Sequence, residues 1–287
     1  MEHTVIMGKT HPLVSTLTEP IQSQNTLNLP GVILLNAGLI HRVGPARLYV
    51  KLARRLAKKG LTTLRFDHSG IGDSSIRRDN LPFWTSAVVE VQEIMDGLQE
   101  QKGIEQFVLM GICSGATTAF NTASIDDRVV GIVMMNAQGY DPNQNWNHYV
   151  MNRYDAKQYR EKFFSFKSWK RAFTGQSQYQ RFIKIYTRRF KNLFLRRRES
   201  SSIAKQLALQ IQNLIEREIR MLMFYSEGDR GLDYLQVILG NRLETILRSS
   251  FIHQEVISGS DHTFTLLRNQ EALFGVIEDW FMRSFHI

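Results

Sequence analysis

Cysteine is nearly absent from this chain, which has one among 287 residues. A single cysteine excludes an internal disulfide and a metal site built from several thiolates. Long apolar runs are also absent, because none reaches the roughly 18 residues of a membrane-spanning helix. The first residues lack the basic and then apolar pattern of a signal peptide. We therefore expect a cytoplasmic protein in which the lone thiol stays reduced.

Positive charge is concentrated in one part of the chain, although the formal net charge is only +9. Residues 141–220 hold 18 Lys and Arg against 6 Asp and Glu, whereas the rest of the chain holds 18 and 21. We predict a near-neutral body, residues 1–140 and 221–287, that carries a basic insertion. Since 43% of all residues are hydrophobic, the chain can bury a sizeable core.

Short apolar runs alternate with amphipathic stretches along the body. In the first amphipathic stretch, Leu48, Leu52 and Leu56 recur at helical spacing, and Gly60 ends it. We predict strands at residues 13–18, 31–35, 61–66, 107–110, 129–135, 221–225 and 251–257. We predict helices at residues 45–59, 84–101, from 117, 232–247 and 264–285. This alternation is typical of an α/β protein with a mostly parallel central sheet and helices on both faces.

The sharpest motif lies at residues 106–116, where an apolar run ends in Gly-Ile-Cys-Ser-Gly-Ala. A strand, Gly-x-nucleophile-x-Gly and a helix together form a nucleophile elbow, which is too tight for bulk two residues before or after the nucleophile. Gly111 and Gly115 occupy those positions around Cys113. Taking Ser114 as the nucleophile would place Ile112 at one of them. The alternative is a buried structural cysteine at an ordinary strand-to-helix turn.

A nucleophile in such an elbow needs a histidine base, and chain order places that base after the acid. His262 lies in the polar loop 258–264, between the last predicted strand and the last helix. We predict it to be the base. The alternative is a loop in which Asp261 or Thr263 merely caps the following helix.

The acid that orients the base should follow the preceding strand, 221–225. Asp229 is the predicted acid, because Glu227 lies too near the strand. Asp233 is the alternative, as the acid or as a helix N-cap. A carboxylate at this place accepts a hydrogen bond from one imidazole nitrogen and leaves the other facing Cys113.

An oxyanion hole would complete the site. One predicted donor is the backbone N–H of Ser114, directly after the nucleophile, and the second is that of Gly38 or Leu39 in the loop after strand 31–35. His41 and Arg42 in the same loop either touch substrate or are simply exposed. The segment 67–74 lacks the spacing of a phosphate-binding loop, and we interpret it as a structural turn.

Four segments, residues 34–45, 64–67, 69–74 and 226–229, resemble the serine-aminopeptidase-like hydrolases of bacterial exopolysaccharide and exosortase-associated gene clusters. With the elbow, they make nearly the whole chain resemble the α/β-hydrolase superfamily. The resemblance implies an α/β-hydrolase fold in which the 141–220 insertion is a lid. Most members have Ser where this chain has Cys113. In having a cysteine at this position, the chain is similar to dienelactone hydrolases, polyhydroxyalkanoate synthases, bile-acid-type N-acyltransferases and some thioesterase domains.

A thiolate is the stronger nucleophile, and a neighbouring histidine favours its formation. We expect Cys113 to cleave an ester or thioester through an acyl-thioester enzyme intermediate. The alternative is an acyltransferase that passes an acyl group from a carrier-protein or CoA thioester to an amine or alcohol. A second alternative is a non-catalytic binding module for an acidic partner. No metal or cofactor enters these predictions.

The basic insertion, residues 141–220, is long enough for three or four helices and interleaves aromatic with basic residues. As a lid, its face would dock an acyl carrier protein, a CoA phosphate or an anionic membrane surface. The alternative is that the aromatic residues form the core of the insertion itself and the charged residues form its solvent-exposed face. Nucleic acid ranks last as a partner. Its last part, residues 202–219, reads as an amphipathic helix with one apolar face: Ile203, Leu207, Ile211, Leu214, Ile215 and Ile219.

Overall fold

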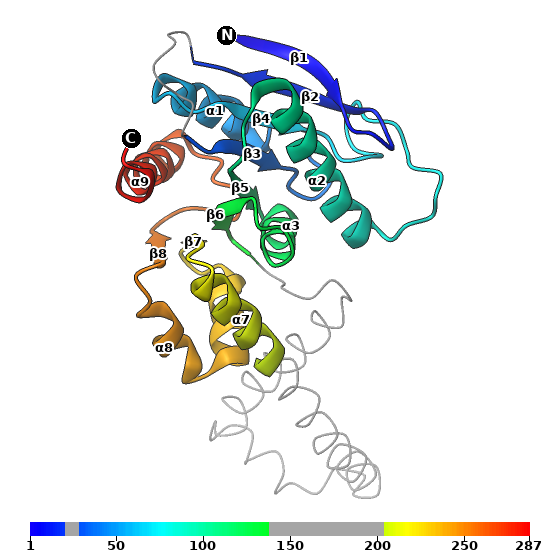
Figure 1. Cartoon of the computed structure of the whole chain (residues 1–287). Helices are drawn as coiled ribbons and strands as arrows, with labels where there is room; N and C mark the ends of the chain where they lie inside the picture. Colours follow the sequence, from blue (N-terminus) through cyan, green and yellow to red (C-terminus); the bar gives the residue numbers. More distant parts are fainter. Residues whose placement is uncertain (21–28, 138–203) are drawn as a thin grey trace, which may run out of the picture.

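A computed structural model describes residues 1–20, 29–137 and 204–287 (Figure 1). Within these residues, eight strands form one sheet in the order β1-β2-β4-β3-β5-β6-β7-β8. β2 is antiparallel to both of its neighbours, and the strands from β4 to β8 pair in parallel, which confirms the mostly parallel sheet. The strands are β1 (Glu2–Met7), β2 (Leu13–Thr18), β3 (Gly31–Leu35), β4 (Thr63–Phe66), β5 (Phe107–Ile112), β6 (Val129–Met135), β7 (Arg220–Ser226) and β8 (Ile252–Ile257).

The central parallel strands β3 and β5 are apolar because helices cover both of their faces, whereas the edge strand β8 is more polar and less buried. Every residue of β3 and of β5 is buried. β1 is a strand that the sequence pattern did not predict, and exposed residues alternate along it. Its pairing depends on distant parts of the chain, since Glu2 forms ion pairs with Arg65 of β4 and with Arg54. β1 therefore extends the antiparallel edge of the sheet.

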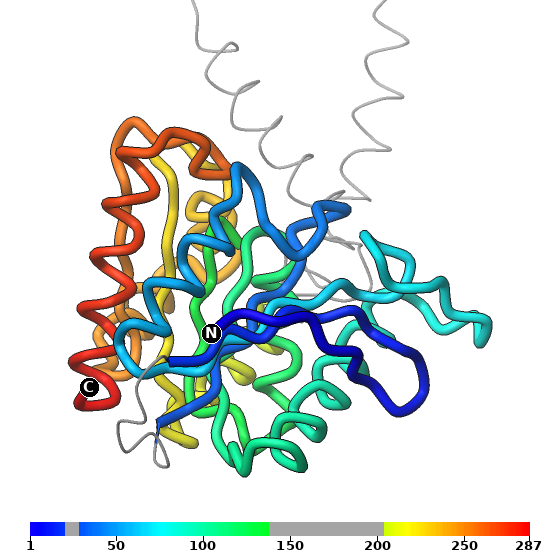
Figure 2. Tube along the Cα trace, turned by 90° about the horizontal axis from the view of Figure 1, so that it is seen from above, coloured from blue at the N-terminus to red at the C-terminus, as the bar shows by residue number. Residues whose placement is uncertain are grey.

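Two helices, α1 (Leu48–Lys58) and α9 (Leu267–Phe285), cover one face of the sheet, and Figure 2 shows them side by side. Arg55 of α1 donates to Glu278 of α9 at 2.5 Å. The other face is covered by α2 (Phe83–Lys102) and α3 (Ser114–Ala123). Each layer packs its own buried apolar cluster against the sheet, as expected for an α/β fold.

The helices predicted from residue 117 and over residues 264–285 begin at Ser114 and Leu267, and two other predicted helices differ more. The predicted helix 45–59 begins with a 3-10 turn, Pro45–Arg47, before α1. The single predicted helix 232–247 is wrong, because the structure has α7 (Arg230–Leu239) and α8 (Arg242–Leu247). Gly240 separates them with φ 54° and ψ −132°, a backbone conformation that glycine adopts readily.

Residues 141–203 of the predicted basic lid lie outside the described residues, so the lid and its acidic partners remain predictions. Its last part is a helix over residues 204–216 that covers the sheet beside α3. Arg217 closes this helix onto the end of α3 by donating to the carbonyl oxygens of Ala123 and Asp126, at 2.6 and 3.0 Å. Its apolar face is buried in the sheet core through Leu207, Ile211 and Leu214.

The described helices include none that is both long and apolar enough to cross a membrane.

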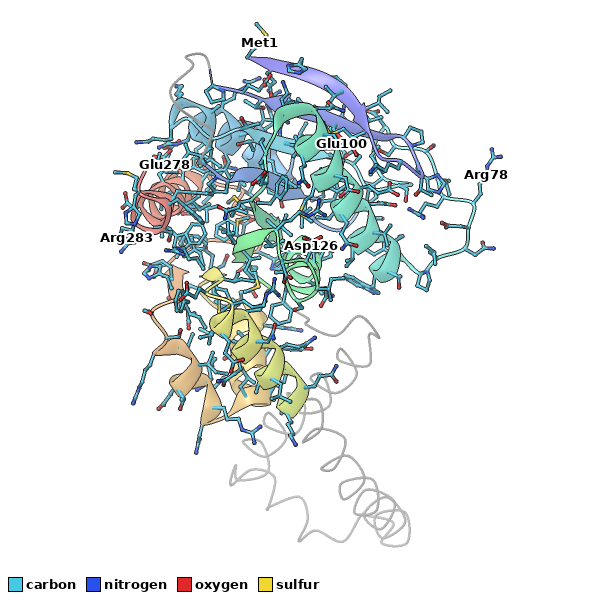
Figure 3. All side chains as sticks on the ribbon, in the orientation of Figure 1. Met1, Arg78, Glu100, Asp126, Glu278 and Arg283 are labelled. Carbon is cyan, nitrogen blue, oxygen red and sulfur yellow. The ribbon has the colours of Figure 1, made fainter. Side chains whose placement is uncertain are left out.

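The loop between β4 and α2 projects from the body, and Arg78 lies near its tip (Figure 3). At the opposite end of α2, Glu100 is exposed. The loops that follow β3, β5, β7 and β8 carry the residues predicted to be functional.

Candidate active site

The turn between β5 and α3 has the backbone of a nucleophile elbow. Cys113 has φ 56° and ψ −112°, a strained combination for a residue with a side chain. Its N–H donates to the carbonyl oxygen of Met135 in β6 at 2.9 Å, and its own carbonyl accepts from the N–H of Thr117. The thiol is half-buried at the start of α3. The turn therefore presents Cys113 at the carboxyl end of the sheet.

The two glycines of the motif are required by contacts with backbone atoms. A Cβ on Gly111 would lie 2.3 Å from the carbonyl carbon of Gly115. A Cβ on Gly115 would lie 2.7 Å from the carbonyl oxygen of Asn36 and 2.8 Å from that of Leu35. Side chains at either position would push α3 away from β5 and from the loop after β3.

The structure brings Cys113, His262 and Asp229 together. His262 lies in the loop between β8 and α9, and Asp229 follows β7. Nδ1 of His262 lies 2.6 Å from Oδ2 of Asp229. The Asp229 side chain is 5% exposed and that of His262 is 36% exposed. The carboxylate thus holds the ring from the protein side, while the ring reaches solvent.

The charges around the ring favour its protonated form. Hydrogen bonds to the Asp229 carboxylate and to the Cys113 side chain raise the pKa of His262 to about 10, although burial opposes the rise. Because Nδ1 is hydrogen-bonded to Asp229, Nε2 is the ring nitrogen that can contact the Cys113 side chain. An imidazolium at this position stabilises negative charge on sulfur, and the thiolate is the nucleophilic form of cysteine.

Asp229 is fixed by a second hydrogen bond that is independent of the histidine. Its Oδ1 accepts from the N–H of Gly231 at 2.8 Å, so that Asp229 is also the N-cap of α7. Asp233, the alternative acid, lies in the first turn of α7 and is exposed. Glu227 accepts from the N–H of Gly259 at 2.9 Å. Of these three carboxylates, Asp229 is the one on Nδ1 of His262.

Two buried polar residues that the sequence analysis did not single out hold the histidine loop. Asn136, directly after β6, donates through Nδ2 to the carbonyl oxygen of His262 at 2.7 Å and to Oγ of Ser226 at 2.8 Å. Its Oδ1 accepts from the N–H of Ser226 at 2.7 Å. Oγ of Ser226 donates to the carbonyl oxygen of Asp261 at 2.7 Å. The ends of β6 and β7 therefore fix the backbone around His262.

Two of the residues predicted to form the oxyanion hole, Gly38 and Ser114, contact each other at this edge. Ser114 is the first residue of α3, and its Oγ accepts a hydrogen bond from the N–H of Gly38 at 2.8 Å. Leu39 follows and is 90% exposed. Gly38 has φ 57°, which favours glycine. The structure thus places the Gly38 N–H beside the elbow, where it already has an acceptor.

The loop after β3 is held in place by Asp67, which follows β4. The Asp67 carboxylate accepts from the N–H of Arg42 at 2.6 Å and from the N–H of Asp73 at 3.1 Å. The Arg42 guanidinium also bonds to the Asp67 carboxylate, and to that of Asp73 at 2.7 Å. Segment 67–74 is therefore a structural turn, as predicted, and Arg42 is part of its anchor. The described residues contain no cluster of side chains suited to hold a metal ion.

Comparison with known proteins gives a consistent result. The sequence profile of the alpha/beta hydrolase fold matches residues 31–182. An esterase from Pyrococcus furiosus has a TM-score of 0.60 at 13% identity, covering 99% of this chain and 90% of that one. Proline iminopeptidase from Mycobacterium smegmatis has a TM-score of 0.57 at 17% identity, covering 99% and 98%. A dienelactone hydrolase from Anabaena variabilis has a TM-score of 0.55 at 13% identity, covering 99% and 97%. No curated protein matches the chain.

Proposed function

Because this chain belongs to the α/β-hydrolase fold family, whose profile matches residues 31–182, we propose that it is a hydrolase with Cys113 as nucleophile. The substrate is an ester or a thioester, and the reaction passes through an acyl-thioester enzyme. The observation that carries this proposal is the hydrogen-bonded series Asp229, His262 and Cys113 at the elbow.

Acylation begins with the Cys113 thiolate. Its Sγ attacks the carbonyl carbon of the substrate, the C–S bond forms, and the π electrons of the carbonyl move onto its oxygen. The tetrahedral species then collapses and the bond to the leaving group breaks. The His262 imidazolium gives its Nε2 proton to the departing alcohol or thiol and becomes neutral. The proton on Nδ1 stays on the ring, in its hydrogen bond to the Asp229 carboxylate.

Deacylation returns the enzyme to its starting state. Neutral His262 takes a proton from water as the water oxygen attacks the thioester carbonyl. Collapse of the second tetrahedral species breaks the C–S bond, and the sulfur leaves as a thiolate. The acid product departs, and the thiolate and imidazolium of the resting site are restored.

Two features separate this proposal from a non-catalytic binding module. Cys113 is partly exposed, whereas a structural cysteine would be expected to be fully buried. The positive φ at Cys113 is a cost that a binding module does not need. The thiol also supports acyl transfer as a second candidate, since an acyl-thioester reacts with amines and alcohols as well as with water.

The test is intact-protein mass spectrometry after mixing with p-nitrophenyl esters and acyl-CoA thioesters. We expect an acyl adduct on the wild type and none on Cys113→Ala, with at most weak turnover by Cys113→Ser. Wild type unfolded in urea keeps the thiol but loses the site, and it controls for indiscriminate acylation.

Full turnover by Cys113→Ala would contradict the proposed mechanism. Absence of both adduct and turnover with every donor would favour the binding module. Where an adduct forms, its decay in water, compared with its decay after an amine or alcohol is added, distinguishes hydrolysis from transfer.

A further inference from the structure

The hydrogen bond between Gly38 and Ser114 places a hydroxyl inside the predicted oxyanion hole. The predicted backbone donors are the N–H of Ser114 and that of Gly38 or Leu39, and Oγ of Ser114 lies 2.8 Å from the nitrogen of Gly38. Donors of an oxyanion hole lie 2.7–3.1 Å from the oxyanion that they stabilise. The Ser114 hydroxyl therefore stands at the distance from Gly38 that an oxyanion would otherwise take.

The hydroxyl has a proton to offer at this position. A serine hydroxyl donates one hydrogen bond and accepts two. Oγ of Ser114 uses an acceptor site for the Gly38 N–H, and among the described residues no acceptor takes its proton. A hydroxyl that accepts a hydrogen bond is polarised and becomes a better donor.

The loop that carries Gly38 is anchored on both sides of that residue. Nδ2 of Asn36 donates to the carbonyl oxygen of Ile40 at 2.9 Å. The N–H of Arg42 donates to the buried carboxylate of Asp67 at 2.6 Å. Withdrawing the Gly38 N–H from Ser114 would require this anchored loop to move. The Gly38 N–H is therefore expected to keep its position while substrate is bound, where it can support the Ser114 hydroxyl.

We propose that the Ser114 hydroxyl is a catalytic residue that donates to the oxyanion, with the Gly38 N–H supporting it from behind. This inference rests on the proposed function, because the oxyanion is the one that forms when Cys113 attacks the carbonyl. The proton stays on Ser114 throughout, since its role is hydrogen bonding. The hole then consists of the Ser114 N–H, at the positive end of α3, and the hydroxyl of the same residue.

The opposite role for the same hydroxyl would have the opposite kinetic effect. If Oγ only blocked the Gly38 N–H in the resting protein, its removal would free a backbone donor and accelerate the reaction. If Oγ donates to the oxyanion, its removal slows the reaction. The two roles are thus distinguished by whether removal of the Ser114 hydroxyl raises or lowers the rate of turnover.

The experiment compares Ser114→Ala and Ser114→Thr with the wild type, using p-nitrophenyl butyrate and its thiono analogue. Sulfur replaces the carbonyl oxygen in the analogue and accepts hydrogen bonds poorly, so it depends less on the hole. The matched control is Ser124→Ala, because Ser124 lies at the other end of α3 and its hydroxyl bonds to the carbonyl oxygen of Phe120.

We expect Ser114→Ala to lower kcat for the oxo ester about 100-fold or more, with little change in KM. Ser114→Ala should also reduce the preference for the oxo over the thiono ester. Ser114→Thr keeps a hydroxyl and should restore most of the kcat and most of this preference. Ser124→Ala should behave as the wild type.

Three results would overturn the inference. Unchanged or faster turnover by Ser114→Ala excludes a donor role, and equal losses on the two esters indicate a structural role. If the wild type neither forms an acyl adduct nor turns over either ester, the proposed function itself fails, and the role of Ser114 fails with it.

Discussion

Replacing Asn136 with alanine should destabilise the protein and disturb the loop that carries His262. Asn136 is completely buried and forms three hydrogen bonds, one to the His262 carbonyl oxygen and two to Ser226. It also has φ 48°, a conformation that asparagine tolerates better than alanine. Alanine would leave the Ser226 N–H and the His262 carbonyl oxygen without this partner.

The magnitude follows from these contacts. Each hydrogen bond contributes about 1 kcal/mol net, and alanine at positive φ costs about 1 kcal/mol more. The expected loss in the free energy of unfolding is therefore about 3–4 kcal/mol. Because the histidine loop loses its tie to β6 and β7, we also expect kcat to fall about 10- to 100-fold through misplacement of the ring.

Urea unfolding and steady-state kinetics on the same preparations provide the measurement. Asn80→Ala is the matched control, because Asn80 has φ 55° but is exposed, so it reports the backbone cost without the buried hydrogen bonds. A cycle with Ser226→Ala should show a coupling of about 1 kcal/mol or more. If Asn136→Ala is as stable as Asn80→Ala and fully active, the positioning role of Asn136 is refuted.

Two further substitutions test the histidine and the elbow. Asp229→Asn should lower the pKa of His262 from about 10 toward its ordinary value near 6.5, because the carboxylate is the largest cause of the rise. Since the folded-state pKa is the raised one, the stabilisation by this pair is complete below about pH 6.5 and is lost as pH rises through about 10. Urea midpoints across this range should fall with pH in the wild type and much less in Asp229→Asn, and equal slopes would contradict this. Gly115→Ala should cost about 1–3 kcal/mol or more through backbone contact, whereas Gly275→Ala, which meets nothing within 4 Å in α9, should be neutral or stabilising in the same assay.

The elbow and the order of the elements could be predicted because their causes are local. Gly111 and Gly115 are spaced around Cys113 by the steric limits of one turn, and apolar runs predict buried strands wherever helices cover both faces. Chain order then assigned His262 and Asp229, since each follows directly after a predicted strand. Short-range sterics and strand order were enough to select these residues before any distance was known.

The contacts that hold the site in place could not be predicted in the same way. Asn136 and Ser226 are 90 positions apart, and Gly38 and Ser114 are 76 apart. Neither residue type nor spacing along the chain signals such pairs. One usable signal was present, because Asn136 is a polar residue that closes an apolar run at the edge where functional loops gather. A polar residue at the end of a buried strand can be buried because it forms hydrogen bonds to the neighbouring loops, as Asn136 does.

Three of the eight non-glycine residues with positive φ in the described part of the chain lie at the site. Cys113, Asn136 and Phe264 have φ of 56°, 48° and 54°. At about 1–3 kcal/mol each, their combined cost is of the same order as the net stability of a typical domain, about 5–15 kcal/mol. Each is fixed to the interior: the N–H of Cys113 donates to the Met135 carbonyl at 2.9 Å, that of Asn136 to the Phe224 carbonyl at 2.8 Å, and the ring of Phe264 is fully buried. The geometry of the thiol and the histidine therefore depends on β6 and β7, two strands that supply no reacting atom.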